Sequence, residues 1–307
     1  MRLSARGWVL TAVLLSACAS VRVPSHPLRV KDGATIELAG MGPCGARSPT
    51  LAPSRPLAIL VHGVHSTGAG LASLADAFRA DGRQAVCFRY DPRASLLRTA
   101  EALRTATAEL AHALRAPDIL LFGHSQGGLV ARAALVAHPH ALPPGHYRLV
   151  TVSSPFAGIR IARSCSSLPY HIASLGVSYA VCRAISGDSW NEIHPRSTLV
   201  RSPAALDPQV DAHVLVVTDE RDTCRRYSVD GRACLQDDYV FSTGEQHNRT
   251  LERDPRVIAA PLSAGHVEVL GAHGPPRKLL EVLERHGLFE QRGAGTGLEQ
   301  QSAKRGW

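Results

Sequence analysis

The feature that most constrains the fold is a glycine-rich motif between an apolar segment and an alanine-rich one. Residues 118–122 form an apolar run typical of a buried strand, and residues 129–137 have helical composition. Between them lies Phe122-Gly123-His124-Ser125-Gln126-Gly127-Gly128, which matches G-x-S-x-G. A strand that turns directly into a helix leaves room only for small residues beside the serine. The motif therefore predicts Ser125 as a nucleophile on a tight strand-to-helix turn.

Other parts of the chain repeat this alternation. Strand-like runs occur at 57–62, 85–90, 147–152, 213–218 and 257–260. Helical spacing or composition occurs at 71–78, 95–115 and 276–286. Strands that alternate with helices predict an α/β fold, with a mostly parallel sheet covered by helices on both faces.

Length and composition indicate a globular protein with one large α/β domain or two small ones. The chain has 307 residues, of which 45% are hydrophobic and 20% charged. We place the domain at residues 28–288, after a tether at 19–27 and before a flexible tail at 289–307. Residues 155–211 separate two strands by far more than an ordinary connection. This insertion is expected to form a cap over the active site, the alternative being a surface excursion without a role.

A second motif ends the first strand of the alternation. Residues 61–65 read Val-His-Gly-Val-His, with His62 and Gly63 at the expected strand end. In hydrolases that form an acyl-enzyme, two backbone N–H groups stabilise the developing oxyanion. Motif position predicts that these groups belong to Val64 and to Gln126, the residue after the nucleophile.

Together the two motifs resemble the bacterial lipase/esterase branch of the α/β-hydrolase superfamily, over about residues 55–288. Residues 151–158 read Thr-Val-Ser-Ser-Pro-Phe-Ala-Gly and are similar to the T-x-x-S-P-H-x-G segment of lipases. Phe156 replaces the usual histidine. The resemblance implies an α/β-hydrolase fold and cleavage of acyl esters through an acyl-enzyme on Ser125. Acyl transfer by the same triad, or a non-catalytic role in binding within the envelope, are the alternatives.

In this fold the acid and then the histidine follow the nucleophile along the chain. His266 follows the expected last strand and precedes the closing helix, in a Gly-His-x-x-x-Leu pattern similar to that of the family's catalytic histidine. It is therefore predicted to take the proton of Ser125. His247 and His273 are the alternatives.

The acid is expected after the strand at 213–218. Four aspartates are considered for this role: Asp219, Asp222, Asp237 and Asp238. The segment Asp237-Asp238-Tyr239-Val240 resembles the N-D-G-x-V segment of lipases, in which the aspartate orients the histidine. We therefore favour Asp238, with Asp222 as the alternative.

The N-terminus has the pattern of an export signal. Arg2 and Arg6 precede a short apolar stretch at 8–17, which is too short to span a membrane in the mature protein. The stretch ends in Leu-Ser-Ala-Cys and resembles the lipobox of bacterial lipoproteins. Residues 1–18 are therefore predicted to be a lipoprotein signal with lipid attached to Cys18, which would anchor the protein in the cell envelope, at the outer membrane. An ordinary secretory signal is the alternative.

Export also predicts disulfides, because the compartment outside the cytoplasm is oxidising. Apart from Cys18, the chain has an even set of cysteines: Cys44, Cys87, Cys165, Cys182, Cys224 and Cys234. Proximity along the chain suggests Cys165–Cys182 and Cys224–Cys234, which leaves Cys44–Cys87. No C-x-x-C, P-loop, H-E-x-x-H or dinucleotide motif is visible, so neither a metal nor a cofactor is expected.

The basic charge of the chain does not indicate a nucleic-acid partner. The formal net charge is +8, but the arginines are scattered along the sequence. No helix-turn-helix, zinc-finger or RNA-binding pattern accompanies them. The expected partners are an acyl-ester substrate and, through the lipid anchor, a membrane.

Overall fold

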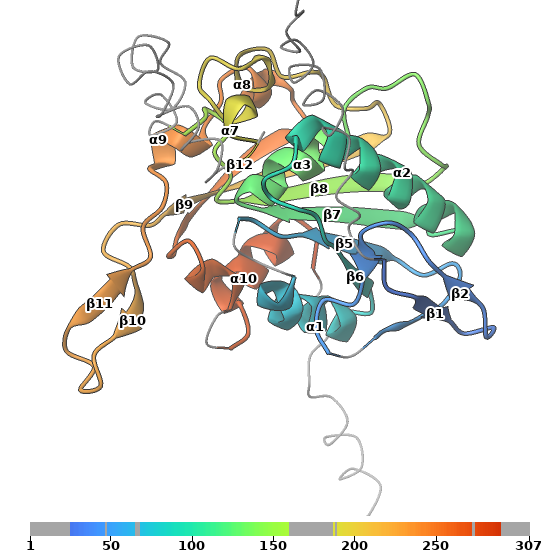
Figure 1. The fold of residues 1–307 in the computed structure, drawn as a ribbon, viewed down its shortest axis with the longest axis horizontal. Helices are drawn as coiled ribbons and strands as arrows, with labels where there is room; N and C mark the ends of the chain where they lie inside the picture. Colours follow the sequence, from blue (N-terminus) through green and yellow to red (C-terminus); the bar gives the residue numbers. More distant parts are fainter. Residues whose placement is uncertain are drawn as a thin grey trace, which may run out of the picture.

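A twisted, mostly parallel sheet forms the centre of the protein (Figure 1). The computed structural model describes residues 25–46, 48–64, 68–159, 187, 189–271 and 274–289. Within these residues the largest sheet has the order β12-β9-β8-β7-β5-β6-β3, and only β3 runs antiparallel to its neighbour. Its strands are β3 (Met41–Gly42), β5 (Leu57–Val61), β6 (Gln84–Phe88), β7 (Asp118–His124), β8 (His146–Val152), β9 (Val210–Asp219) and β12 (Val257–Ser263). The predicted fold class is confirmed.

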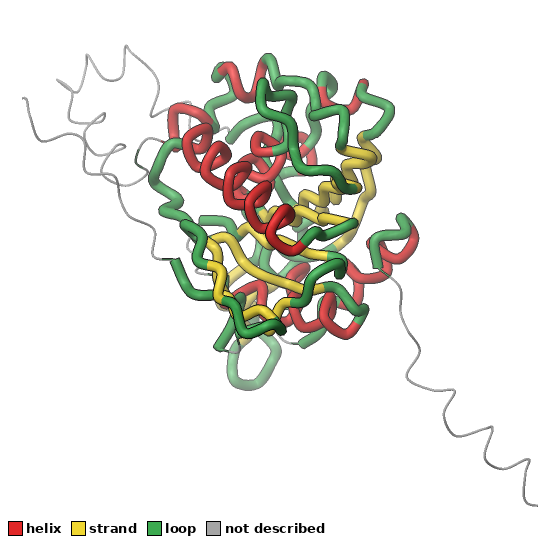
Figure 2. Tube along the Cα trace, turned by 90° about the vertical axis from the view of Figure 1, so that its right-hand side faces the viewer, coloured by secondary structure: helices red, strands yellow, loops and turns green. Residues whose placement is uncertain are grey.

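Helices cover the sheet on both faces, as the two views in Figures 1 and 2 show. The long helices are α1 (Ala72–Ala80), α2 (Leu96–Leu114), α3 (Gln126–Ala134) and α10 (Arg277–Arg285). Alternate side chains of one strand enter different cores. Ile59 of β5 packs in the core that contains α2 and α3, whereas Leu60 packs in the core that contains α1 and α10. Because both faces are buried, the strands are continuous apolar runs.

The helix after the nucleophile motif begins earlier than its composition predicts. The sequence predicts a helix over 129–137, but α3 already starts at Gln126 and ends at Ala134. The glycines at 127 and 128 lower helix propensity, yet the tight turn places them in the first helical turn. Tertiary geometry therefore overrides local propensity at this point.

Smaller elements lie around the sheet. Near the N-terminal end of the described chain, β1 (Leu28–Val30) pairs antiparallel with β2 (Thr35–Ile36). The hairpin of β10 (Cys224–Tyr227) and β11 (Cys234–Asp237) was not predicted, and it projects from the body of the molecule (Figure 1). The remaining short elements are β4 (Thr50–Leu51), α7 (Ser189–Glu192), α8 (Thr198–Arg201), α9 (Thr243–Gln246) and the 3-10 helices η1 (Ala69–Leu71), η2 (Leu251–Arg253) and η3 (Glu268–Leu270).

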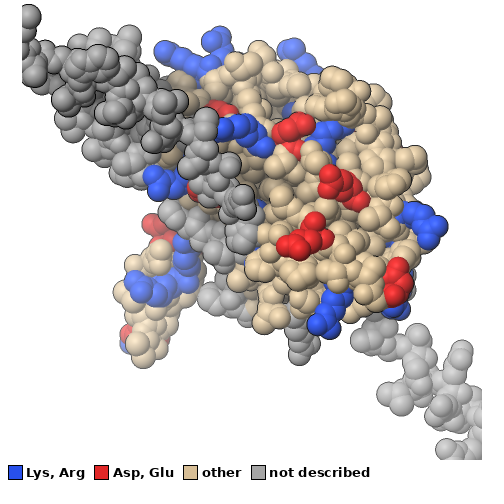
Figure 3. Space-filling view, turned by 45° about the vertical axis from the view of Figure 1, so that its right-hand side comes forward, with Lys and Arg blue, Asp and Glu red and all other residues tan. Residues whose placement is uncertain are grey.

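Two of the suggested disulfides are present, Cys44–Cys87 and Cys224–Cys234. Cys165 and Cys182 lie outside the described residues, as do the whole predicted signal with Cys18, residues 19–24 of the tether, residues 160–186 and 188 of the predicted cap, and residues 290–307 of the tail. In the part of the chain that the structure describes, no helix has the length and apolar character needed to cross a membrane. On the face drawn in Figure 3, basic side chains lie among acidic ones and do not form a single block.

A histidine is buried between two central strands. His213 of β9 is fully buried, and its Nε2 lies 2.7 Å from Oγ1 of Thr151 in β8. Burial first, and then the nearby charge of Arg132, lower the pKa of His213 to about 3. The ring is therefore neutral in the folded protein at neutral pH.

We expect His213 to make the protein sensitive to acid. Below the ordinary histidine pKa of about 6.5, the unfolded chain binds a proton that the folded chain does not, so the free energy of unfolding falls as the pH drops from 6.5 towards 3. Between pH 7 and pH 5, urea denaturation should show the wild type losing about 2 kcal/mol more than His213→Gln. Equal losses in the two proteins would contradict this expectation.

Candidate active site

Ser125 lies on the predicted tight turn between β7 and α3. Its backbone has φ 56° and ψ −128°, a conformation that residues with a side chain rarely adopt. Its N–H donates to the carbonyl oxygen of Val152, at the end of β8, over 2.9 Å. The strained turn is therefore fixed against the neighbouring strand, at the carboxyl ends of the parallel strands.

Close approach of the chain explains the glycines of both motifs. A Cβ at Gly123 would lie 2.5 Å from the carbonyl oxygen of Gly127, and a Cβ at Gly127 would collide with the carbonyl oxygen of His62. A Cβ at Gly63 would lie 2.8 Å from Cβ of Ser125. The two motifs, far apart in the sequence, thus pack directly against each other.

His62 has a structural role in this packing. The ring is buried, stacks on Tyr90 and has Nδ1 2.8 Å from the carbonyl oxygen of Gly63. The Tyr90 hydroxyl donates to the carbonyl oxygen of His62 over 2.8 Å. Burial lowers the pKa of His62, so the ring stays neutral and holds the loop in place.

The two predicted oxyanion donors lie in the adjoining loops. Val64 follows Gly63 and is 46% exposed, and Gln126 is the first residue of α3. The first amides of a helix have no partner within the helix, so the N–H of Gln126 is available to a ligand. The side chain of Gln126 is engaged elsewhere and donates to the carbonyl oxygen of Pro92 over 2.9 Å. Binding of an oxyanion by these two amides stays a prediction.

His266 lies in the loop after β12 and contacts the nucleophile turn. Its carbonyl oxygen lies 2.8 Å from Nε2 of His124, and the two rings are 4.7 Å apart between centroids. Burial first, and then the neighbouring His266, lower the pKa of His124 well below its ordinary value, so its neutral ring donates this hydrogen bond. The residue before the nucleophile thereby joins its turn to the histidine loop.

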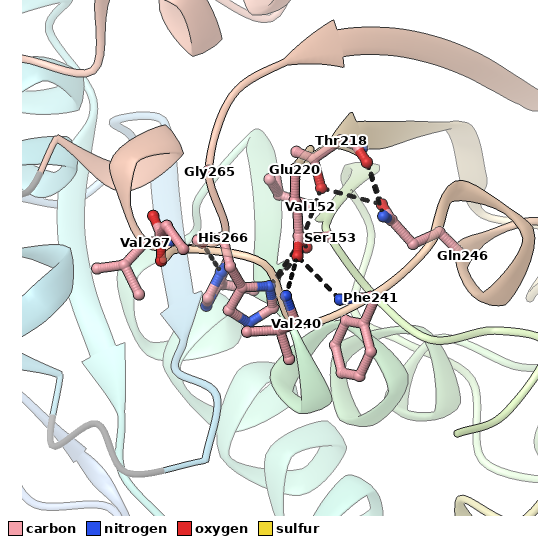
Figure 4. A network of polar contacts seen from close by, with 12 residues as sticks. Val152, Ser153, Thr218, Glu220, Val240, Phe241, Gln246, Gly265, His266 and Val267 are labelled. Carbon is pink, nitrogen blue, oxygen red and sulfur yellow. Dashed lines mark hydrogen bonds and ion pairs between the residues drawn. The ribbon is translucent and has the colours of Figure 1, made fainter. Parts of the chain in front are cut away.

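The carboxylate that faces the His266 ring belongs to Glu220, the residue directly after β9. Oε1 of Glu220 lies 2.8 Å from Nδ1 of His266 (Figure 4). The carboxylate is buried and accepts hydrogen bonds from five groups: His266 Nδ1, the hydroxyls of Ser153 and Thr218, and the backbone N–H groups of Val240 and Phe241. Burial raises its pKa, but the hydrogen bond and charge of His266 and the other donors outweigh burial and leave the pKa below its usual value.

This arrangement corrects the prediction that Asp238 contacts the histidine ring. Oδ2 of Asp238 accepts the N–H groups of Val267 and Glu268 over 2.9 and 2.8 Å, and Oδ1 accepts two hydrogen bonds from Arg225. The Asp238 carbonyl oxygen also accepts the N–H of His266 over 2.9 Å. Both oxygens of the buried carboxylate are thus occupied, one by the backbone of the histidine loop and one by Arg225. Asp238 therefore holds the loop that carries the ring.

The other candidates lie away from the ring. Asp219 forms an exposed ion pair with Arg221, and Asp222 and Asp237 are exposed. His247 pairs with Glu252, and His273 lies outside the described residues. Sequence reasoning missed Glu220 because only aspartates were weighed, although this fold accepts either acid. Its position two residues after the predicted strand at 213–218 was the available signal.

Within the described ranges, no cluster of histidine, cysteine, aspartate and glutamate side chains could hold a metal ion. The groups on these adjoining loops are instead the Ser125 hydroxyl on a strained turn, the His266 imidazole, whose loop is bonded to that turn through His124, and the buried Glu220 carboxylate. This set can activate a serine for nucleophilic attack.

The chain is similar to known proteins in part of its sequence and in its fold. The model of a family described as "Putative serine esterase (DUF676)" matches residues 53–186, which include Ser125 but neither Glu220 nor His266. No curated protein matches the chain by sequence.

Solved structures share the fold. Bacillus licheniformis lipase BlEst2 in its mature form aligns with a TM-score of 0.51 and 14% identity, over 81% of this chain and 97% of the lipase. Propionate-bound esterase Est2 of Thermogutta terrifontis aligns with a TM-score of 0.51 and 13% identity, over 89% and 97%. The lin2722 product of Listeria innocua aligns with a TM-score of 0.50 and 13% identity, over 78% of this chain and 96% of that protein. The protein therefore has an α/β-hydrolase fold.

We expect Asp238→Asn to destabilise the protein. The change removes the charge that accepts the two loop amides and Arg225, and hydrogen bonds to a buried charged group contribute about 2 kcal/mol each. Urea denaturation should show a loss of about 2 kcal/mol or more for Asp238→Asn. The exposed neighbour provides the matched control, because Asp237→Asn should change stability by no more than about 0.5 kcal/mol. Similar small effects for both would show that Asp238 does not hold the loop.

Proposed function

We propose that this protein is a serine hydrolase that cleaves carboxylic esters through an acyl-enzyme on Ser125. The observation that carries the proposal is the hydrogen bond between His266 Nδ1 and buried Glu220, in a loop bonded to the nucleophile turn. This bond fixes the tautomer that leaves Nε2 free to accept the serine proton. The family match and the lipase and esterase names of the similar structures support the same class.

The mechanism follows from the roles of these groups. Oγ of Ser125 attacks the ester carbonyl carbon while Nε2 of His266 takes the hydroxyl proton, and the N–H groups of Gln126 and Val64 stabilise the oxyanion. The imidazolium returns the proton to the departing alcohol, which leaves the acyl group on Ser125. Water, deprotonated by His266, then attacks the acyl-enzyme; the bond from the acyl carbon to Oγ of Ser125 breaks, Oγ takes the proton back from His266, and the carboxylic acid is released. Glu220 stabilises the imidazolium and stays ionised throughout, because five donors hold its charge.

We further propose that the protein is exported and anchored in the cell envelope by lipid on Cys18. Support comes from the sequence alone, through the basic start, the short apolar stretch and the Leu-Ser-Ala-Cys pattern. The two disulfides found in the described part of the chain are in keeping with an oxidising compartment.

The catalytic assignment predicts a graded series of variants. On p-nitrophenyl esters of increasing chain length, the wild type should turn over and Ser125→Ala should not. Glu220→Gln keeps the shape of the acid but loses its charge, and should lower kcat by about 10³- to 10⁴-fold, as in other triads that lose this carboxylate. Asp222→Asn, an exposed change two residues away, should keep kcat within about twofold.

The outcomes of these assays distinguish a wrong choice of acid from acyl transfer and from a non-catalytic role. If Glu220→Gln behaves like Asp222→Asn, another residue is the acid. If the wild type hydrolyses no ester but a fluorophosphonate labels Ser125, acyl transfer to another acceptor becomes the better proposal. If neither turnover nor labelling occurs, the hydrolase proposal fails and a binding role remains.

The envelope proposal predicts incorporation of lipid. Cells that express the protein and are fed radiolabelled palmitate should show label on the wild type, which should fractionate with the membranes. Cys18→Ala should lose both the label and the membrane association. A wild type that is exported without label would indicate an ordinary secretory signal.

A further inference from the structure

A second serine lies inside the hydrogen-bonded group around the histidine. Ser153, directly after β8, is fully buried, and its Oγ lies 2.8 Å from Nδ1 of His266 (Figure 4). The same hydroxyl donates to Oε1 of Glu220. Nδ1, Oε1 and Oγ thus form a closed triangle of polar atoms, which the three-residue mechanism does not require.

The directions of the hydrogen bonds are mutually consistent. The hydroxyl proton of Ser153 points to Glu220, so its lone pairs face the Nδ1–H of His266. The single Nδ1–H is therefore shared between two acceptors, each 2.8 Å away. A single acceptor fixes its distance from the imidazole Nδ1 but lets the ring turn about that hydrogen bond. Two acceptors also fix the orientation of the ring.

The backbone fixes Ser153 relative to the nucleophile. Its N–H donates to the carbonyl oxygen of Val216 in β9 over 3.1 Å, and the preceding carbonyl, that of Val152, accepts the N–H of Ser125. One strand end therefore holds the nucleophile turn and, one residue later, the hydroxyl at the histidine.

The backbone of Ser153 also suits this placement. Its φ of 50° lies in the left-handed region, where a serine is unusual. This conformation turns the side chain from the strand towards the acid and the imidazole. Such outliers persist where the surroundings determine them, and they cluster at active sites.

We propose that Ser153 is a positioning residue that acts through His266 and Glu220, in addition to the three residues of the proposed triad. This inference rests on the proposed hydrolase function. Ser153 touches neither substrate nor reacting atoms. It directs Nε2 of His266 towards Ser125 and helps to keep Glu220 ionised.

The test compares Ser153→Ala with Ser154→Ala in ester hydrolysis. The adjacent serine is a matched control, because its buried hydroxyl donates only to the Val152 carbonyl oxygen. Ser153→Ala should lower kcat by about 10- to 100-fold, the effect of losing a hydrogen bond to a charged group, with KM within about threefold. Ser154→Ala should keep kcat within about threefold.

Two further measurements distinguish positioning from folding. Ser153→Gly also lacks the hydroxyl but suits a positive φ, so it should show the same loss of kcat while keeping its melting temperature. In a Glu220→Gln background, Ser153→Ala should have an effect of about threefold or less, because the partner it aligns is already lost. Equal effects in both backgrounds, or a Ser153→Ala variant no slower than Ser154→Ala, would overturn the proposal.

A spectroscopic readout keeps this test separate from the hydrolase proposal. The Nδ1–H proton of His266 should give a downfield proton resonance in the folded wild type. This resonance should move or broaden in Ser153→Ala and stay in place in Ser154→Ala. Should the protein prove inactive on esters, an unmoved resonance would still overturn the role of Ser153, and a moved one would support it.

Discussion

The charge of Glu220 is the constraint on which the rest of the site depends. A carboxylate away from water is costly unless donors surround it, and here five donors do so. They come from the end of β8, the end of β9, the segment at 240–241 and the loop of His266. Because each donor must reach the same two oxygens, four separate segments are fixed relative to one another. The geometry of the candidate site is therefore set largely by the hydrogen bonds that stabilise one buried charge.

Much of the fold could be predicted from the sequence because both faces of the sheet are buried. Continuous apolar runs such as β5 have one explanation in a chain of this length, a strand between two helical layers. The turn that carries Ser125 could also be predicted from the sequence, because backbone contacts at Gly123 and Gly127 exclude any side chain. These features are local, or depend on a contact that only glycine permits, and so they leave a clear mark in the sequence.

The proposed acid, Glu220, could not be identified from the sequence in this way. Glu220 contacts His266 because it lies at the end of β9, within reach of the ring. In the sequence, several acidic residues near that strand end fit this requirement equally well. The sequence favours Asp238 because its segment resembles the N-D-G-x-V segment of lipases, and the structure does bury this carboxylate beside the histidine loop. Only the coordinates show that its oxygens face the backbone of the histidine loop instead of the ring. Deciding between two buried carboxylates requires the direction of each side chain, which depends on the packing of several segments.

The projecting hairpin of β10 and β11 separates Glu220 from Asp238 in the chain but not in space. Its base is closed by the hydrogen bond from the Asp238 N–H to the Thr223 carbonyl oxygen, by the pair between Arg225 and Asp238, and by the disulfide Cys224–Cys234. Beyond this closure, residues 228–233 form no part of the network around His266. We therefore expect that the tip can be lengthened, shortened or replaced by a foreign loop while the two carboxylates keep their separation. A protein built in this way can change what it presents to its surroundings without altering its chemistry.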